Sequence, residues 1–594
     1  MLELLQTSEF LQDPETGIWT LKELKRFDYS DGDENENYLL EVLQNAKDKS
    51  IYSEELRKSI KDWPSLYHLS RRRSNLLRPF EEILKNKKIL EIGCGCGAIT
   101  RYIGELGAEV YSIEGSFRRA KSARERCKEL SNVTIICGSS DKLPEYGEFD
   151  VVLLIGVLEY SPKFLGPEGP ELLLKSIYRQ LKPEGLLILA IENQLGLKYF
   201  AGYPEDHAGI PMYGINNSYT EGEFVTFGRK VLEDLLLDAG FDTLEQYIPL
   251  PDYKLPVSIV TPLGWQKYPD EMCSLALESV KEDAQRSPYS FLSLENAYIP
   301  VWKNGLAQDL ANSFLFSCYK GEKSEFSNIL AYYFSDARKI DYLKRLEFLE
   351  DEGVVIKAYH GNSSSIEEFI QGESYFKKLL NILNRPGWSI EEIVSWTKVW
   401  YDALLKELGL SENITLTAAV ESKYWDATPF NAILDEKGDL CFFDLEWTGL
   451  KQIDLGLVLW HGLFISFIRV TDVSSPVQGQ SLNVLEIIYR IMLYLGFDLS
   501  KESLLEYEKR DRQIISDLSG IDEPEEHILY VKNRCLRERI LPEQAEQKLL
   551  QKEQELRQKE EELRQKEEEL KAVYSSNSWK VTEPVRHIIK IIKK

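Results

Sequence analysis

Three glycines and one carboxylate, at the ends of two neighbouring strand-like stretches, form the first group that could do chemistry. The stretch 87–93 runs into a turn that contains Gly93, Gly95 and Gly97, and the stretch 109–114 ends on Glu114. Glycine allows a tight turn and lets a ligand approach where a Cβ would collide. A carboxylate about 20 residues further on can accept hydrogen bonds from both ribose hydroxyls. The spacing is GxGxG and not the GxGxxG of dinucleotide-binding proteins, so it favours a nucleoside ligand over NAD.

A second group of polar residues has the spacing of a phosphotransferase catalytic loop. Asp426 lies five residues before Asn431, and Asp444 follows after a short turn. In such a loop one aspartate orients or deprotonates an acceptor hydroxyl, while the asparagine and a second aspartate hold Mg²⁺ against nucleotide phosphates. We therefore predict that Asp426 is catalytic and that Asn431 and Asp444 bind Mg²⁺. Upstream, Lys357 could contact the phosphates, and Glu373 could pair with this lysine.

Alternating strands and helices must position the first group. Buried strands are indicated at 87–93, 109–114, 133–138, 149–156 and 185–192, and helices at 98–107, 117–130 and 171–181. Strands this apolar are buried on both faces, as in a parallel sheet that is covered by helices. The alternation predicts a doubly wound α/β domain. After it the chain becomes looser, and we expect a substrate-side insertion before a closing strand at 311–321.

The chain of 594 residues is too long for one hydrophobic core, because single cores stop growing near about 250–300 residues. We predict an α/β protein with a Rossmann-like first domain, an α+β bilobal second domain and a helical C-terminal extension. The predicted segments are an N-terminal helical segment at 1–84, the first domain with its insertion at 85–324, the second domain at 325–535, a charged helix or coiled coil at 536–575 and a basic amphipathic tail at 576–594.

The extension repeats every seven residues, with an apolar residue at one of the two core positions of a coiled coil and Lys or Glu at the other. The repeated residues are Leu549, Leu556, Leu563 and Leu570. A weak coiled coil, which would allow a homo-oligomer, and a solvated spacer helix both remain open. The tail, 578–594, is basic and apolar and could bind a membrane surface or a partner; an ordinary helix end at Pro584 is the alternative.

The first group, with the motifs that follow it, resembles the class I S-adenosylmethionine (SAM)-dependent methyltransferases over roughly 85–240. The motifs are EIGCGCG at 91–97, GSSDKLP at 138–144 and IGVLEY at 155–160. The resemblance implies that SAM binds here, with its methionine end on the glycine turn and its ribose on Glu114. It implies adenine contacts from Ser139 or Ser140, although many relatives carry Asp where Ser139 stands.

Candidates for the methyl-acceptor site lie at the ends of the following strands, where ligands of α/β sheets bind. An O-methylation needs a base near the acceptor hydroxyl, or binding that aligns oxygen, methyl and sulfur. The candidates are Glu159, Glu192, Asp206 and His207. We predict His207 as the catalytic residue, because an imidazole titrates near neutrality. Each of the four could instead be a structural polar residue.

The second group resembles aminoglycoside phosphotransferase-like kinases over about 350–460, in its D-x-x-P-x-N loop, its F-D-x-E strand and a structural Asp454. The resemblance implies ATP and Mg²⁺ as cofactors. Tyr424 stands where such kinases carry His, and no glycine-rich phosphate loop precedes Lys357. An active kinase, a degenerate nucleotide-binding or scaffold domain and an unrelated structural use therefore stay open.

The order of the segments resembles the bifunctional methyltransferase–kinases that terminate bacterial O-antigen chains. This resemblance implies a glycan acceptor at the end of a surface polysaccharide, capped by phosphoryl and methyl transfer. The helix would be a spacer, and the tail would bind glycosyltransferases or the inner face of the plasma membrane. The alternatives are a sugar O-methyltransferase with an inactive kinase-like binding module, and a scaffold for glycosyltransferases.

Composition excludes several other classes. The formal net charge of −25 disfavours broad attraction to nucleic acid, so we expect no nucleic-acid partner. No apolar run reaches the about 18–20 residues of a membrane span, and the N-terminus lacks a signal peptide. The eight cysteines are scattered without a CxxC pair, which indicates neither zinc nor disulfides. A cytoplasmic location, with peripheral membrane contact through the tail, is the expectation.

Overall fold

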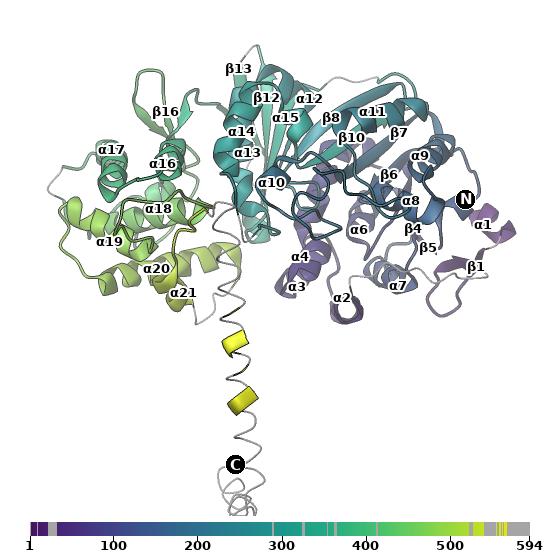
Figure 1. Cartoon of the computed structure of the whole chain (residues 1–594), viewed down its shortest axis with the longest axis horizontal. Helices are drawn as coiled ribbons and strands as arrows, with labels where there is room; N and C mark the ends of the chain where they lie inside the picture. The colour runs from purple at the N-terminus through teal and green to yellow at the C-terminus, as the bar shows by residue number, and fades with distance from the viewer. Residues whose placement is uncertain are drawn as a thin grey trace, which may run out of the picture. The chain divides into compact units, whose positions relative to one another are not determined.

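The computed structural model describes residues 2–8, 10–21, 32–287, 290–323, 327–352, 354–360, 365–411, 414–521 and 527–539, with 554, 557–559, 561 and 564–566 (Figure 1). In this part of the chain the strands form a 14-stranded sheet and a 3-stranded sheet. The order in the large sheet is β1-β2-β5-β4-β3-β6-β7-β10-β8-β9-β11-β12-β13-β14.

The parallel half of the large sheet confirms the predicted doubly wound domain. Its strands, in sheet order, are β5 (Val133–Cys137), β4 (Glu109–Glu114), β3 (Lys88–Ile92), β6 (Phe149–Ile155) and β7 (Leu181–Glu192). They are parallel throughout. The chain direction across the sheet reverses between β3 and β6, and in open α/β sheets this is where a crevice forms at the carboxyl ends of the strands.

Two helical layers cover the two faces of these strands. The layers are α6 (Ala98–Glu105) with α7 (Phe117–Arg126), and α9 (Gly169–Gln180) with α11 (Arg229–Asp238). Successive residues of β6 point to opposite faces. Val151 and Leu153 belong to the core that contains α6 and α7 residues, whereas Val152 and Leu154 belong to the core that contains α9 and α11 residues. The predicted two-sided burial of the strands is thus observed, and it explains their continuous apolar sequences.

The sheet continues past the parallel strands with antiparallel ones. These are β10 (Ser313–Tyr319), β8 (Thr243–Leu250), β9 (Ser258–Val260), β11 (Ile329–Ser335), β12 (Lys344–Asp351), β13 (Val354–His360) and β14 (Ser365–Glu368). β8 is shared: residues 243–247 pair with β10 and residues 248–250 with β9. β9 pairs in turn with β11, with Ile259 opposite Tyr332. The strands on the two sides of residue 325 therefore lie in one sheet, so the predicted domain boundary there does not separate two sheets.

The N-terminal segment is not entirely helical as expected. β1 (Phe10–Gln12) and β2 (Trp19–Leu21) form a hairpin, and β2 extends the sheet by pairing in parallel with β5. The helices of the segment are α1 (Leu2–Thr7), α2 (Asp33–Asn45), α3 (Glu54–Lys58), α4 (Trp63–Leu69), η1 (Arg71–Phe80) and α5 (Glu81–Leu84). α2 packs on α7, and η1 packs on α6. The segment is therefore part of the first domain and not an appendage.

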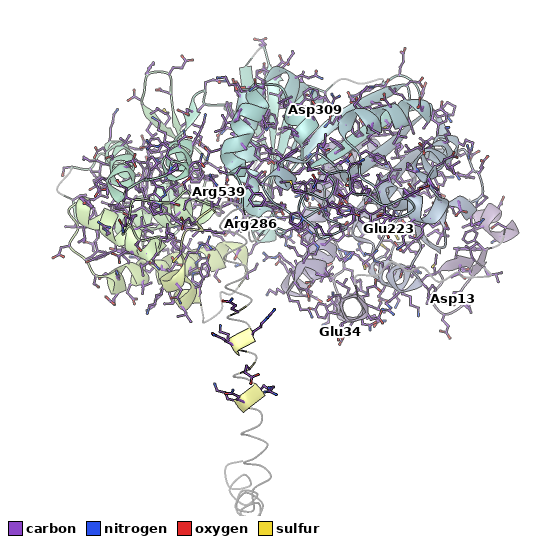
Figure 2. All side chains as sticks on the ribbon, in the orientation of Figure 1. Asp13, Glu34, Glu223, Arg286, Asp309 and Arg539 are labelled. Carbon is purple, nitrogen blue, oxygen red and sulfur yellow. The ribbon has the colours of Figure 1, made fainter. Side chains whose placement is uncertain are left out.

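The segment 193–310, expected to be looser, has its own core. Its helices besides α11 are α10 (Leu197–Phe200), α12 (Pro262–Lys267), α13 (Pro269–Ser279), α14 (Leu294–Lys303) and α15 (Ala307–Leu310); the short helix α8 (Ser161–Leu165) precedes them. Buried Met272, Tyr298 and Trp302 from α13 and α14 pack with Leu346 and Phe348 of β12. Asp309 of α15, labelled in Figure 2, forms an ion pair of 2.6 Å with Arg229 at the start of α11.

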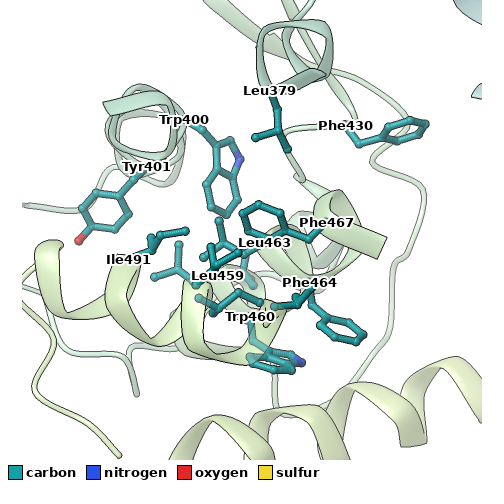
Figure 3. Close-up of a cluster of buried hydrophobic side chains, with 14 of the residues drawn as sticks. Leu379, Trp400, Tyr401, Phe430, Leu459, Trp460, Leu463, Phe464, Phe467 and Ile491 are labelled. Atoms are coloured by element: carbon teal, nitrogen blue, oxygen red, sulfur yellow. The ribbon is translucent and has the colours of Figure 1, made fainter. Parts of the chain in front are cut away.

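Residues 373–539 form a small sheet and a group of helices around one apolar core (Figure 3). The elements are β15 (Glu373–Ser374), α16 (Tyr375–Asn384), α17 (Ile390–Leu408), η6 (Ser422–Asp426), β16 (Ala432–Leu434), β17 (Leu440–Phe442), α18 (Leu455–Arg469), α19 (Val484–Tyr494), α20 (Lys501–Ser519) and α21 (His527–Asn533). Helix α18 is apolar on nearly every side and lies buried at the centre. Trp400 of α17 packs in this core, and its indole N–H donates to the carbonyl oxygen of Ala427 at 2.9 Å.

The predicted coiled coil and tail fall almost wholly outside the described residues, including all four heptad leucines and the segment 578–594. The described residues 554, 557–559, 561 and 564–566 are helical and exposed. They belong to a compact unit separate from residues 1–288 and 292–538. Within the described part of the chain, every helix is too short or too polar to cross a membrane.

The core in Figure 3 gives a stability prediction. Trp400→Ala should lower the free energy of unfolding by about 3–5 kcal/mol, because it removes a fully buried indole and leaves the carbonyl of Ala427 without its donor. The control is Val399→Ala on the same helix, where the side chain is 50% exposed, and a change within about 0.5 kcal/mol is expected. Urea unfolding followed by circular dichroism measures both. Equal losses in the two variants would contradict the assigned core.

Candidate functional site

The predicted glycine turn lies between β3 and α6, at the reversal of strand order. Gly93 and Gly97 have φ values of 80° and 79°, which favour glycine. A Cβ on Gly93 would lie 2.3 Å from Val157 Cγ2, and one on Gly97 would lie 2.8 Å from the Cα of Ala123 in α7. Gly93 therefore allows close packing against Val157 at a position that lines both cavities, whereas Gly97 allows the turn to pack on α7. Gly97 is not among the residues that line the cavities beside the turn, contrary to its expected cofactor contact.

Glu114 closes this turn as predicted, at the end of β4. Its carboxylate accepts a hydrogen bond of 2.8 Å from the Gly95 N–H and one of 2.9 Å from the Ser116 N–H. The side chain is almost fully buried and lines a cavity of about 120 Å³. Two backbone donors thus hold the carboxylate at the cavity wall, where a ribose could add further hydrogen bonds.

The cavity wall beyond Glu114 suits a planar, partly apolar nucleobase such as adenine. Ile113, Phe164 and Leu165 line it, together with Ser139 and Ser140. The Ser139 hydroxyl donates to the carboxylate of Asp141, so an acidic group stands two residues after the position where relatives carry Asp. The predicted binding residues Gly93, Glu114, Ser139 and Ser140 therefore share one cavity.

A second cavity, of about 270 Å³, adjoins the first. The two share five lining residues, namely Ile92, Gly93, Arg119, Gly156 and Tyr160. The far wall of the second cavity carries the predicted acceptor-site residues Glu159, Glu192, Asp206 and His207. A ligand whose nucleoside occupied the first cavity would thus direct its other end past the glycine turn toward these side chains.

His207 lies at the centre of a buried polar cluster. Its Nδ1 is hydrogen-bonded to Tyr160 Oη at 2.9 Å, and its Nε2 lies 3.6 Å from Glu192 Oε2. Burial favours the neutral ring, but the carboxylates of Glu192, Glu159 and Glu205 outweigh it and raise the pKa of His207 to about 9. The pKa of His207 thus lies above the near-neutral value expected from the sequence, because the sequence did not show that three carboxylates surround the ring.

The carboxylates of the cluster are not equivalent. Burial, reinforced by the charge of Glu192, raises the pKa of Glu159 to about 8. Burial also opposes ionisation of Glu192, yet Lys254 and His207 hold the pKa of Glu192 well below its usual range. Glu192 thus stays ionised, whereas Glu159 holds a proton near neutral pH in the empty cavity.

Asp206 has a structural role in this cluster. Its carboxylate accepts from Lys254 Nζ at 2.7 Å and from Tyr199 Oη at 2.6 Å, and it pairs with Lys198 Nζ at 3.1 Å. Although burial opposes ionisation, the two lysines lower the pKa of Asp206 below its usual range. Because lysine and tyrosine side chains bind both carboxylate oxygens of Asp206, this residue positions Lys254 and does not act as a base toward a methyl acceptor.

Sequence reasoning missed several residues of the acceptor cavity. Lys254 binds Glu192 Oε1 at 2.6 Å, and Tyr253 Oη donates to the same oxygen at 3.0 Å. Arg73 donates to the carbonyl oxygens of Tyr253 and Lys254 at 3.0 and 3.1 Å and so fixes their loop. Trp63 and Tyr67 of α4 line the opposite wall. No local sequence signal marked them, because the cavity joins segments that are far apart along the chain.

The second predicted group also comes together. Asp426 ends η6, and the Asn431 side chain donates to the Asp426 carbonyl oxygen at 3.0 Å. Asp444, with a φ of 58°, pairs with Lys344 Nζ at 3.0 Å. Lys344, which sequence reasoning missed, also binds Glu446 at 2.8 Å. Asp426, Asn431 and Asp444 therefore lie on consecutive loops that face two strands of the large sheet.

Two predictions about this group need correction. Glu373 pairs with Lys377 at 3.2 Å and not with Lys357, because Glu373 lies in β15, directly before α16, and Lys377 lies four residues further on in the first turn of that helix. Lys357 of β13 instead lies 5.2 Å from the Phe443 ring, beside Asp444, and burial lowers its pKa. The lysine is therefore placed near the expected phosphate position without the expected glutamate.

His461 of α18 occupies the place beside Asp426 where a histidine was missing from the loop. Its Nε2 lies 3.7 Å from Asp426 Oδ1, and its Nδ1 is hydrogen-bonded to Asp511 at 3.0 Å. Trp447 Nε1 donates to the other oxygen, Asp426 Oδ2, at 3.3 Å. Burial favours neutral imidazole, but Asp511 and Asp426 raise the pKa of His461 to about 9. A charged histidine from a different helix thus holds Asp426 in place.

Comparisons with known proteins support the first site. Residues 90–189 match a family described as a methyltransferase domain. The ubiquinone biosynthesis O-methyltransferase of Parvibaculum lavamentivorans is 31% identical over 191 residues, 30% of this chain and 67% of that protein. The mitochondrial ubiquinone biosynthesis O-methyltransferase of Rattus norvegicus is 31% identical over 166 residues, 26% of this chain and 45% of that protein. The chain thus spans between about half and two thirds of these curated relatives.

A solved structure of Haemonchus contortus phosphoethanolamine N-methyltransferase 2 aligns with 19% identity and a TM-score of 0.27, covering 42% of this chain and 52% of that one. Values this low assign neither a substrate nor a mechanism.

The geometry of the first cavity predicts how SAM binding depends on Glu114. Glu114→Gln should weaken SAM binding by roughly 10–100-fold, because hydrogen bonds from ribose to a charged acceptor contribute about 1.5–3 kcal/mol. The control is Glu109→Gln, at the exposed start of the same strand, which should leave the dissociation constant unchanged. Isothermal titration calorimetry measures both. Similar affinities in all three proteins would exclude Glu114 from the ribose site.

The first cavity offers a glycine-walled entrance, a fixed carboxylate and an apolar slot in the order that SAM requires, and the family match covers the strands that build it. Through this region, the chain belongs to the class I SAM-dependent methyltransferases.

Proposed function

We propose that this methyltransferase transfers the methyl group of SAM to an oxygen of a sugar-containing acceptor that binds in the second cavity. The observation that carries the proposal is the junction of the two cavities at Gly93 and Tyr160. A methyl group on SAM at this junction would face the cluster of Glu159, Glu192 and His207. Alignment of acceptor oxygen, methyl and sulfur is the main requirement for such a transfer.

The residues that line the second cavity support a sugar as the methyl acceptor. Carboxylates, Lys254 and Gln285 offer acceptors and donors for hydroxyl groups, and Trp63 and Tyr67 offer aromatic faces. A sugar ring presents hydroxyls at its edge and C–H groups on its faces. The hydroxyls can therefore bind the polar side chains of the cavity, and the C–H groups can pack on the aromatic rings. The two aromatic rings lie 5.9 Å apart on one helix. The relatives named as O-methyltransferases support an oxygen as the acceptor atom.

The chemical step fits the cluster. Attack of a hydroxyl oxygen on the methyl carbon breaks the sulfur–carbon bond and leaves neutral S-adenosylhomocysteine, a methyl ether and one proton. Ionised Glu192 can receive this proton, and Glu159 and His207 beside it can hold the hydroxyl. Lys254 and Tyr253 keep Glu192 in position and would not need to move.

We further propose a second activity, ATP-dependent phosphorylation of a sugar hydroxyl, for the region around Asp426. The specific observation is that the Asn431 side chain donates to the Asp426 carbonyl oxygen, and that Asp444, one residue after the Phe443 N–H bonded to the Asn431 carbonyl oxygen, lies beside Lys344 and Lys357. In this reading Asp426 orients the acceptor, while Asn431 and Asp444 bind Mg²⁺ and the lysines bind phosphates. His461 supports the reading, because it restrains Asp426 as a catalytic-loop histidine would.

The order of the segments supports a biological setting. We propose that the acceptor is the end of a bacterial surface polysaccharide, capped on the cytoplasmic side of the membrane. In this setting the charged extension is a spacer, which would also allow a homo-oligomer, and the basic tail binds glycosyltransferases or the inner membrane surface. A sugar O-methyltransferase with an inactive kinase-like binding module is the alternative.

The methyl-transfer proposal predicts a selective loss in His207→Gln. Transfer from labelled SAM to glycan fragments should fall by about 10²-fold, because a group that holds the acceptor hydroxyl in line with the methyl group is lost. The affinity for SAM should not change, since His207 lines only the second cavity. His527→Gln in α21, the same chemical change far from either cavity, should retain activity. A normal rate in His207→Gln would rule out this acceptor site.

The phosphoryl-transfer proposal predicts that Asp444→Asn abolishes labelling of glycan from γ-labelled ATP, because the carboxylate that holds Mg²⁺ is lost. Methyl transfer should persist in this variant. Glu436→Gln, in the exposed turn between β16 and β17, is the control and should label normally. Labelling that persists in Asp444→Asn would show that the site is misassigned. Wild-type protein that binds ATP without labelling any glycan would favour the binding-module alternative.

A further inference from the structure

Three buried side-chain atoms in the acceptor cavity have no hydrogen-bond partner. They are Glu159 Oε2, Glu192 Oε2 and His207 Nε2. Both glutamates are 1% exposed. Buried polar atoms are normally paired, since an unpaired one costs about 1–3 kcal/mol. Three such atoms in one place therefore indicate that something is bound there in the working protein.

The three residues face one another at the spacing of metal ligands. One ligand atom from each lies within 4.8 Å of the others. The distance of 3.6 Å between His207 Nε2 and Glu192 Oε2 is too long for a hydrogen bond but leaves room for an ion between them. Two carboxylates and one imidazole bound at about 2.0–2.2 Å would leave open positions on the metal toward the cavity.

The surroundings orient the ligands as in known metal sites. A ligating histidine usually donates its other ring N–H to a hydrogen-bond acceptor, which fixes the ring. Tyr160 Oη occupies this place, 2.9 Å from His207 Nδ1. Lys254 and Tyr253 both bind Glu192 Oε1, so that Oε2 is the oxygen directed at the imidazole. In both His207 and Glu192, one side-chain atom is thus held by a neighbouring residue and the other is directed toward the proposed ion.

The charge of the cluster favours a cation. Glu192, Asp206 and Asp252 share the two buried lysines, Lys198 and Lys254. In the protonation states that metal binding requires, with Glu159 ionised and His207 neutral, the cluster has two more carboxylates than lysines. Arg73 also lines the cavity, but its guanidinium donates to backbone oxygens. A divalent cation beside Glu159 would balance the negative charge that the two lysines do not neutralise.

We propose that Glu159, Glu192 and His207 bind a divalent first-row transition-metal ion, such as Mn²⁺ or Zn²⁺, in the wall of the acceptor cavity. Imidazole together with carboxylate suits such ions better than it suits Ca²⁺ or Mg²⁺, which prefer ligand sets made of oxygen alone. His207 is then a ligand and does not itself take the acceptor proton. This set is separate from the proposed Mg²⁺ ligands Asn431 and Asp444.

The role of the ion rests on the proposed methyl transfer. An acceptor hydroxyl that occupies an open position on the ion is acidified, because the cation stabilises the alkoxide. The hydroxyl proton leaves to solvent, the oxygen bonds to the methyl carbon, and the electrons of the broken bond return to sulfur. The ion is unchanged and no oxidant or reductant is needed. The same ion also fixes the acceptor oxygen beside the junction of the two cavities.

The experiment measures binding of Mn²⁺ to the full chain after dialysis against EDTA. Loss of the electron paramagnetic resonance signal of free Mn²⁺ gives the bound fraction without any assay of activity. All proteins carry Asp444→Asn, so that the proposed Mg²⁺ site does not contribute. Glu159→Gln and His207→Gln each remove one ligand at nearly constant volume. Glu233→Gln on α11 is the matched control, because this half-buried glutamate pairs with Arg229 and lines neither cavity. Calorimetry with SAM verifies that each variant retains the folded first cavity.

We expect the Asp444→Asn protein to bind one Mn²⁺ per chain. Either ligand variant should weaken this binding by at least about 10–100-fold, and the control should match its parent. No saturable binding, or equal affinity in the ligand variants, overturns the site. If the site binds Mn²⁺ but EDTA-treated protein methylates an acceptor at the full rate, the catalytic role of the ion is overturned. If no Mn²⁺ binds and methyl transfer still proceeds, the metal site is refuted and the proposed function stands.

Discussion

Ionised Glu192, buried at the end of β7, is the group around which the first site is built. A carboxylate that is 1% exposed needs a positive or hydrogen-bonding partner, because burial of an unpaired charge is very costly. Lys254 and Tyr253 supply the partners from the loop between β8 and β9. Lys254 in turn requires Asp206, which is held by Lys198 and Tyr199. One buried charge thus fixes the insertion against the strand ends and shapes the acceptor cavity.

The continuous sheet connects the two candidate sites physically. β8 pairs with β10 of the first domain along its first half and with β9 along its second half. β9 then carries β11, β12 and β13, and the last two hold Lys344 and Lys357. The lysines that face Asp444 therefore stand on an extension of the sheet that also holds the SAM cavity. Removing either half of the sheet would leave a long unpaired strand edge on the other.

Sequence patterns were sufficient for the parallel strands, for the glycine turn and for the position of Glu114 at the end of β4. Each is a local feature, in which residue type and spacing along a few dozen positions determine the geometry. The pairing of Glu373 with Lys357 was wrong, since Glu373 pairs instead with Lys377, four residues further on in the first turn of α16. Lys254, Lys344 and His461 carried no local signal, because each acts on a partner far away in the chain.

The amino-acid sequence by itself determined which strands are buried on both faces, where the backbone must turn without a Cβ and which segments could bind a nucleoside or a phosphate. Only the tertiary structure decided that the strands after residue 325 extend the first sheet, and that Glu159, Glu192 and His207 meet in one cavity. The physical reason is that local periodicity fixes which face of an element is apolar. The pairing of buried charges depends instead on which distant segments the fold brings within a few ångströms.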